Sequence, residues 1–483
     1  MQASGQAFLA IDELSFRFPP GGTGTGLVLD GVRLDLPRQA TGVLLGSADA
    51  GKSTLARIIS GLVPRFTGGA IAGSLRVGGT SIRGVPPYEL LNAVGLVAQD
   101  SDEQLLSTRC DTEVAFALES LGVPRPEMRE RVADSLQRVG LAGFESRNPA
   151  TLSGGEKKRL LVACLLAVGP DLWILDEALG ELDTEWRPRV LDLVAARGGT
   201  TLLLESRLTE LVEERGTSFF LLEAGRICAR ASSARDGRLG AALATAGIRP
   251  PTGRGLRPAA RGGALLAEGI EFAFDPSGFR LRIERLELGL GETCALVGRN
   301  GSGKSTLGRI LCGLLRPREG TVSLRGTVGS RRIPPEELGS HVGYLFQNPD
   351  HQIFLPTVRE ELALGLRTRG AAPNDVEARV GEAASLFGLA DLDAPPALLS
   401  YGARRRLQAA CYYLLSRDLL ILDEIDSGLS YGEIHSLLDA LSSRVPGLVL
   451  ITHDMVLARH ACHRVLLMEE GRITRDTRSE SVP

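Results

Sequence analysis

The chain has 483 residues, of which 43% are hydrophobic and 23% are charged, and its formal net charge is −3. This length and composition indicate a folded protein with more than one domain. The near balance of charge excludes a broad basic surface for nucleic acid as the main functional feature. No apolar run is long enough for a membrane span, the first residues lack a signal-peptide pattern, and seven scattered cysteines form no C-x-x-C pair. We therefore expect a reducing, cytoplasmic location.

The first chemically informative element is a short apolar strand at residues 40–45 that leads into a glycine-rich loop and a helix over 54–62. The loop, GSADAGKST, fits the phosphate-loop pattern G-x-x-x-x-G-K-[ST]. In such a loop, backbone N–H groups and the helix amino terminus bind phosphate oxygens, the lysine reaches the β- and γ-phosphates, and the serine ligates Mg²⁺. The residues assigned to ATP binding here are Gly46, Gly51, Lys52, Ser53 and Thr54.

An acidic pair follows later, at the end of the apolar strand 172–175. Asp176 suits a Mg²⁺-binding role, together with Ser53. Glu177 is placed to polarise an attacking water as a general base. The pair therefore predicts ATP hydrolysis rather than binding alone.

The second half of the chain repeats these motifs. A second phosphate loop, GRNGSGKST, places Lys304 252 residues after Lys52, and the pair Asp423-Glu424 follows the first acidic pair by 247. The residues assigned to ATP binding in this loop are Gly298, Asn300, Gly301, Gly303, Lys304, Ser305 and Thr306, with Ser305 and Asp423 also assigned to Mg²⁺. One unit of about 230 residues is therefore duplicated, and the alternation of strands and helices predicts an α/β fold with a mainly parallel sheet in each copy.

The copies imply a simple domain plan. We expect a first ATPase domain over residues 1–231, a Pro/Gly/Arg-rich linker over 232–263, a second domain over 264–476 and a tail over 477–483. The linker prediction rests on its Pro and Gly content and on the lack of a sustained apolar period.

The motif LSGGE at residues 152–156 resembles the signature motif of ATP-binding-cassette (ABC) ATPases, and the other motifs stand in the order of that family. The resemblance implies two tandem P-loop nucleotide-binding domains, each with a mainly parallel sheet, an antiparallel β subdomain and a helical subdomain. It also implies that the two domains pair head to tail within the chain. Each ATP then lies between the phosphate loop of one domain and the signature of the other. The signature residues assigned to ATP are Ser153, Gly154, Gly155, Ser400 and Gly402.

The site built on Lys304 has every residue that the family pattern requires for hydrolysis. Gln347 matches the glutamine that the family places near Mg²⁺ and the attacking water, as Gln99 does in the first copy. His453 matches the switch histidine that contacts the γ-phosphate. With Glu424 as general base, we expect this site to hydrolyse ATP.

The site built on Lys52 departs from the family pattern. Serine stands at 206, where the second copy has His453, and aspartate at 49 brings a carboxylate close to phosphate charge. Its partner signature has tyrosine at 401 where glycine is expected, which would crowd a close approach, and Ser430 where the first copy has an aspartate. We expect this site to bind ATP and turn it over slowly or not at all, with Glu177 leaving residual hydrolysis possible.

Two aromatic residues stand upstream of the phosphate loops in matching contexts. Phe18 and Phe274 can each stack on adenine. The alternative, that they are core aromatics of strands, stays open.

The segment FQNPDHQIFLPTVREE, residues 346–361, resembles the ATPase subunits of energy-coupling-factor importers for cobalt, nickel and vitamins, and residues 61–73 resemble their double-length fused members. This implies an integral membrane coupling subunit docked beside Gln99 and Gln347, a substrate-binding membrane subunit, and a peripheral position on the cytoplasmic face of the membrane. A double-length sugar-importer ATPase is the alternative. A soluble double-cassette ATPase acting on ribosomes or DNA fits less well, given the short spacing between motifs and the net charge.

Overall fold

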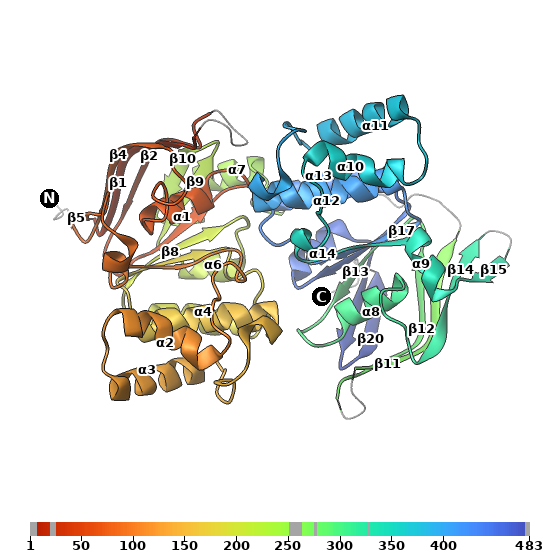
Figure 1. Ribbon diagram of the computed structural model, residues 1–483, viewed down its shortest axis with the longest axis horizontal. Coiled ribbons are helices and arrows are strands. Elements are labelled where there is room, and N and C mark those ends of the chain that lie inside the picture. The colour runs from red at the N-terminus through yellow and green to blue at the C-terminus, as the bar shows by residue number, and fades with distance from the viewer. Residues whose placement is uncertain (1–6, 20–25, 251–262, 275–277, 327–328, 479–483) are drawn as a thin grey trace. The chain divides into compact units, whose positions relative to one another are not determined.

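The computed structural model describes residues 7–19, 26–250, 263–274, 278–326 and 329–478. The chain divides into two compact units, Met1–Arg249 and Pro250–Pro483, and each carries one copy of the repeat (Figure 1). Each unit combines a six-stranded, mainly parallel sheet with a four-stranded antiparallel sheet and with helices. The predicted α/β class and the three subdomain types are confirmed.

In the first unit, the six-stranded sheet has the order β10-β9-β3-β8-β7-β6. All neighbours pair in parallel except β9 and β10. The strands are β3 (Thr41–Leu45), β6 (Val94–Val97), β7 (Leu172–Asp176), β8 (Thr200–Glu205), β9 (Ser218–Glu223) and β10 (Arg226–Ala231). Because the carboxyl ends of parallel strands meet at one edge, the phosphate loop after β3 and the acidic pair at the end of β7 come together there.

The strand β7 is buried along its whole length, as expected for a parallel strand covered on both faces. Trp173 and Leu175 belong to one apolar cluster, and Leu172 and Ile174 to another. Successive side chains of a strand point to opposite faces, so the sheet separates two cores. The first core lies under the helices and the second under the antiparallel sheet.

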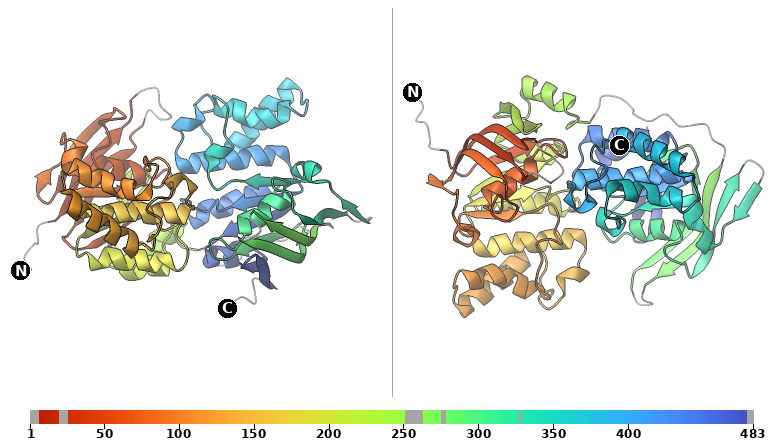
Figure 2. Two further views of the ribbon diagram at one scale, coloured as in Figure 1. Left: turned by 60° about the horizontal axis from the view of Figure 1, so that its bottom comes forward. Right: turned by 45° about the horizontal axis from the view of Figure 1, so that its top comes forward.

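The antiparallel sheet of the first unit has the order β2-β1-β4-β5, with strands β1 (Leu9–Arg17), β2 (Leu29–Leu36), β4 (Ala70–Val77) and β5 (Thr80–Ser81). The helices are α1 (Lys52–Ile59), α2 (Cys110–Ser120), α3 (Arg125–Arg138), α4 (Gly154–Val168), α5 (Trp186–Ala196), α6 (Glu210–Arg215) and α7 (Gly237–Thr245), with short 3₁₀ turns at Pro87–Leu90 and Pro149–Thr151. Helices α2, α3 and α4 pack together, and the right view of Figure 2 shows these orange helices on the far side of the unit from the red antiparallel strands.

The beginning of the expected linker is folded, contrary to our prediction. Helix α7 contributes Leu239 and Leu243 to the core of the first unit, and Ile248 follows them. Arg249 donates from its guanidinium to the carbonyl of Ala234 at 2.9 Å. The sequence concealed this element because the helix is short and its apolar residues are diluted by Gly, Ala and Arg. The first unit therefore ends at Arg249, and the remaining linker residues 251–262 lie outside the described residues.

The second unit repeats the strand order as β16-β17-β18-β13-β19-β20, with an antiparallel sheet of order β12-β11-β14-β15. The strands are β11 (Ala264–Ala273), β12 (Arg280–Gly289), β13 (Thr293–Val297), β14 (Glu319–Gly326), β15 (Gly329–Arg332), β16 (Val342–Leu345), β17 (Leu419–Asp423), β18 (Gly447–Thr452), β19 (Arg464–Glu469) and β20 (Arg472–Arg478). The helices are α8 (Lys304–Leu311), α9 (Pro335–His341), α10 (Val358–Arg367), α11 (Pro373–Leu386), α12 (Tyr401–Leu415), α13 (Tyr431–Ser442) and α14 (Met455–Ala461), with 3₁₀ turns at Pro349–His351 and Pro396–Leu398. The last strand includes Thr477 and Arg478, which we had expected in the tail.

Within the described ranges, we find no helix with the length and apolar character required to cross a membrane.

Candidate active site

Both phosphate loops form as predicted. Gly51 and Gly303 are the N-caps of α1 and α8, and each has φ of 102°, a conformation that a side chain would strain. Lys52 Nζ donates to the carbonyl of Gly46 at 2.7 Å, and Lys304 Nζ donates to that of Gly298 at 2.8 Å. Each buried lysine thus folds back across its own loop, where a phosphate-binding ammonium is required.

The unusual aspartate of the first loop fits its backbone conformation. Asp49 has φ of 38°, and its counterpart Gly301 has φ of 77°. Both lie in the left-handed region, which aspartate tolerates better than most residues. The substitution therefore changes the charge of the loop without preventing its formation.

The second unit carries a buried acidic site suited to Mg²⁺. Asp423 Oδ1 accepts a hydrogen bond from Ser305 Oγ at 3.1 Å, and the other carboxylate oxygen accepts one from the hydroxyl of Tyr344. Burial raises the pKa of Asp423, and repulsion from Glu424 raises it further, against the opposing hydrogen bonds of Tyr344 and Ser305. A cation relieves this excess of buried negative charge, so the donor set fits Mg²⁺ held by one carboxylate, a hydroxyl and phosphate oxygens.

The first unit offers the same donors. Asp176 is buried, and its Oδ1 has no hydrogen-bond partner within the part of the chain that the structure describes. Burial raises the pKa of Asp176 to about 6, although the hydrogen bond from Ser53 opposes the shift. An orphaned buried carboxylate oxygen is the feature that a bound cation would satisfy. The residues at both predicted Mg²⁺ positions therefore fit a bound cation.

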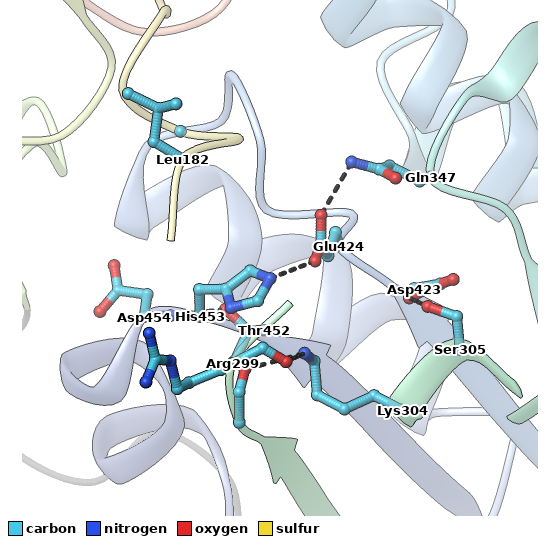
Figure 3. Close-up of polar contacts among 12 residues, drawn as sticks. Leu182, Arg299, Lys304, Ser305, Gln347, Asp423, Glu424, Thr452, His453 and Asp454 are labelled. Carbon is cyan, nitrogen blue, oxygen red and sulfur yellow. Dashed lines mark hydrogen bonds and ion pairs between the residues drawn. The ribbon is translucent and has the colours of Figure 1, made fainter. Parts of the chain in front are cut away.

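Glu424 lies between two polar side chains of the second unit (Figure 3). His453 Nε2 lies 2.5 Å from Glu424 Oε1, and Gln347 Nε2 donates to Glu424 Oε2 at 2.8 Å. Burial raises the pKa of Glu424, but the hydrogen bond and charge of His453, with Lys304 and Arg405, outweigh it and hold the pKa below its usual value. The carboxyl is therefore ionised near neutral pH, as a proton acceptor must be.

Both acidic pairs place the glutamate in a strained backbone conformation. Glu177 has φ of 51° and Glu424 has φ of 47°. A non-glycine residue with positive φ has an energetic cost that proteins tolerate chiefly at functional sites. The shared strain supports the prediction that these two residues have equivalent positions.

The glutamate of the first unit makes different contacts. Its Oε1 lies 3.5 Å from Lys52 Nζ and accepts a hydrogen bond from the Ser206 hydroxyl. Ser206 also accepts a hydrogen bond from Lys52 Nζ at 3.0 Å. Because the serine is short, Glu177 is held against the phosphate-loop lysine instead of between a histidine and a glutamine.

A second carboxylate at this site was missed by our sequence reasoning. Glu205 ends β8 and is 7% exposed, at the position that Thr452 occupies in the second unit. Burial raises the pKa of Glu205 well above its usual value, and Glu177 adds to the shift. The available signal was an acidic residue at the end of the otherwise apolar run LLL, directly before Ser206.

The signature serines begin helices. Ser153 is the N-cap of α4 and forms a capping box with Glu156, and Ser400 is the N-cap of α12 and accepts from Ala403 N at 3.1 Å. The glycines Gly154, Gly155 and Gly402 lie in the first turns of these helices. Each signature thus presents a helix amino terminus, which favours an anionic ligand.

The two predicted glutamines differ in their contacts. The side chain of Gln347 binds the carboxylate of Glu424, whereas the backbone carbonyl of Gln99 accepts from Lys158 Nζ at 2.5 Å. Direct ligation of Mg²⁺ by either glutamine stays a prediction.

The two aromatic candidates also differ from each other. Phe18 packs edge-on against Phe16 and joins the core of the first unit, while Phe274 packs against Phe272 and is 66% exposed. Stacking on adenine stays a prediction for both residues.

This fold, with a phosphate loop, an acidic pair and a signature helix in each unit, defines a protein with two P-loop ATPase units. The ABC transporter family pattern matches residues 29–180 and 281–427, so the chain belongs to the ABC transporter family and is an ATP-binding subunit of such a transporter.

Its relatives agree with this assignment. A protein of Caldanaerobacter subterraneus subsp. tengcongensis, provisionally named an ABC transporter ATP-binding protein, is 30% identical, and the match covers 96% of this chain and 90% of the relative. A Streptomyces coelicolor protein with the same provisional name is 32% identical, with 92% and 90% covered.

Among solved structures, cbiO1 from Clostridium perfringens, part of the ABC transporter complex cbiONQ, matches with 23% identity and a TM-score of 0.42. That match covers 50% of this chain and 95% of cbiO1. An ATP-binding subunit of an ABC transporter matches with 27% identity and a TM-score of 0.40, over 44% of this chain and 90% of the neighbour.

Proposed function

We propose that the chain hydrolyses ATP in its second unit and thereby powers an energy-coupling-factor importer for a vitamin or a transition-metal ion. The observation that carries the hydrolytic assignment is the position of Glu424 between His453 and Gln347. The importer type rests on the resemblance of residues 346–361 to the subunits of such systems. The resemblance also implies head-to-tail pairing of the two units around two ATP molecules and a position on the cytoplasmic face of the membrane.

The proposed reaction assigns a separate task to each group of the second unit. The phosphate loop and Lys304 hold the β- and γ-phosphates. Ser305 and Asp423 hold Mg²⁺, which when bound neutralises phosphate charge. Glu424 accepts a proton from the attacking water, while His453 and Gln347 fix the direction of its carboxylate. In the first unit, Lys52 and Ser206 engage Glu177, which supports slow turnover at that site.

Steady-state ATPase activity of the full chain tests this division. Glu424→Gln keeps the shape of the side chain and removes its basicity, so we expect turnover to fall by about a hundredfold or more. Glu177→Gln is the matched control and should retain at least about half of the activity. Equal losses in the two variants would contradict the asymmetry.

The proposed membrane docking surface is a segment that follows the glutamine loop, the loop that contains Gln99 in the first unit and Gln347 in the second, and it is built in the same way in both units. A buried glutamate, Glu113 or Glu361, accepts hydrogen bonds from two successive backbone N–H groups of this segment. The first of the two residues held in this way is Leu106, 75% exposed, or Phe354, 73% exposed. A loop fixed by a buried carboxylate that presents a large apolar side chain to solvent fits an apolar partner helix.

Uptake in cells tests the importer assignment. Cells that contain the chain with its membrane partners are compared with cells that carry Glu424→Gln, using labelled vitamins, cobalt and nickel as separate substrates. We expect the cells that carry the variant to lose uptake of one of these solutes. Loss of sugar uptake instead would favour the sugar-importer alternative.

A further inference from the structure

The tyrosine of the second signature makes a contact that the sequence did not predict. We expected Tyr401 only to crowd the signature, but its hydroxyl donates to the backbone carbonyl of Gln347 at 3.2 Å. The side chain of Gln347 in turn binds Glu424 at 2.8 Å. The start of the signature helix is therefore bonded to the residue that orients the proposed general base of the same unit.

Arg405, one helical turn after the tyrosine, completes this connection. It is 1% exposed, and its guanidinium donates to the Tyr401 hydroxyl at 2.8 Å. The same side chain donates to the carbonyl of Phe346 at 3.1 Å and to the carbonyl of Glu424 at 3.2 Å. The planar fork of the arginine thus ties the tyrosine, the glutamine loop and the backbone of the glutamate together.

The first unit achieves the same connection with a single residue. The counterparts of Tyr401 and Arg405 are Gly154 and Lys158. Lys158 is fully buried, and its ammonium donates to the carbonyls of Ala98 at 2.7 Å and Gln99 at 2.5 Å. These two carbonyls correspond to those of Phe346 and Gln347. One lysine therefore fills the role that an arginine and a tyrosine divide in the second unit.

From this comparison of the two units, we propose that Tyr401 is a positioning residue for ATP hydrolysis in the second unit. It acts through Gln347: with Arg405 it fixes the backbone of the glutamine loop, so that the glutamine amide stays on Glu424. Without the hydroxyl, the Gln347 carbonyl lacks its donor, and a small rotation of the loop misplaces the amide. The proposal rests on the proposed function, in which Glu424 is the general base.

The first test is Tyr401→Phe in the full chain, which removes the hydroxyl and keeps the ring. We expect kcat for ATP to fall by about threefold to tenfold with little change in KM, because the hydroxyl binds the loop and not the phosphates. Tyr413→Phe is the matched control, since this tyrosine lies on the same helix and bonds Glu382 at 3.1 Å instead. An unchanged kcat in Tyr401→Phe, or a change in KM alone, overturns the proposal.

The second test is a rescue that recreates the pair of the first unit. Tyr401→Gly and Arg405→Lys should each lower kcat when made alone. The double variant should recover most of the activity, because a lysine beside a glycine can bind both carbonyls. A double variant that is worse than both single variants overturns the proposal, since this is what a merely structural role predicts.

Glu424→Gln separates this proposal from the proposed function. If Glu424→Gln keeps its ATPase activity, the assignment of the general base fails, and the role of Tyr401 fails with it. If Glu424→Gln is inactive and Tyr401→Phe equals the wild type, only the role of Tyr401 fails.

Discussion

Glu177 Oε1 lies 3.5 Å from Lys52 Nζ in the first unit, whereas Oε1 of the equivalent Glu424 in the second unit lies 2.5 Å from His453 Nε2. The two carboxylates share a strained backbone and differ in their partners. In the first unit the carboxylate forms an ion pair with the phosphate-loop lysine. In the second unit an imidazole and an amide hold the carboxylate in one orientation. This difference is the physical basis for expecting unequal hydrolysis.

His453 should therefore contribute more to ATPase turnover than Ser206, which takes its place in the first unit. We predict that His453→Ala lowers the ATPase turnover of the full chain by about a hundredfold, because Glu424 loses the group that orients it. Ser206→Ala should change turnover by less than about threefold. Binding of a fluorescent ATP analogue serves as the control, since both variants should still bind nucleotide. Similar losses in turnover for both substitutions would contradict this prediction.

The Mg²⁺ assignment predicts a change in metal dependence. Asp423→Asn keeps the size of the side chain and one of the two oxygens that accept from Ser305 and Tyr344, but it removes the charge that a cation requires. We expect the Mg²⁺ concentration for half-maximal ATPase activity to rise by at least about tenfold. Asp439→Asn, on helix α13 outside the site, is the control and should leave this concentration unchanged.

Much of this arrangement could be predicted from the sequence, because phosphate loops, acidic strand ends and helix-capping signatures are local patterns with fixed geometry. The strand predicted at residues 40–45 is observed at Thr41–Leu45, and Lys52 and Lys304 lie where their motifs require. The contacts of Tyr401 and Glu205 could not be predicted in this way. Tyr401 contacts Gln347, which is 54 positions away in the chain, and Glu205 lies beside Glu177, which belongs to a different strand end, so only the folded backbone brings these residues together.

Helix α7 gives a prediction about stability. Leu243 is fully buried in the core of the first unit, although we had placed it in a linker. Leu243→Ala should lower the free energy of unfolding of this unit by about 2–4 kcal/mol, because it removes buried methyl groups and leaves a cavity. Leu27→Ala, at a residue that is 52% exposed, is the control and should have little effect in urea denaturation. A linker role for residue 243 would make the two variants equal.

Glu205 gives a prediction about pH. Burial and the neighbouring Glu177 raise the pKa of the Glu205 carboxyl in the folded state, so folding favours the protonated form. The contribution of this carboxyl to stability is then fully present below the unfolded pKa, near 4.3, and is lost as the pH rises through the pKa of the folded state.

Glu205→Gln removes the ionised form, so the thermal midpoint of the variant should exceed that of the wild type by a few degrees at pH 8 and by little at pH 4.5. Glu210→Gln, at an exposed glutamate of helix α6, is the reference variant for the loss of a carboxyl, and its thermal midpoint is measured at the same two pH values. An equal shift at both pH values would mean that the carboxyl of Glu205 is ionised throughout, and that its burial is balanced by charge from Arg187 and Arg207.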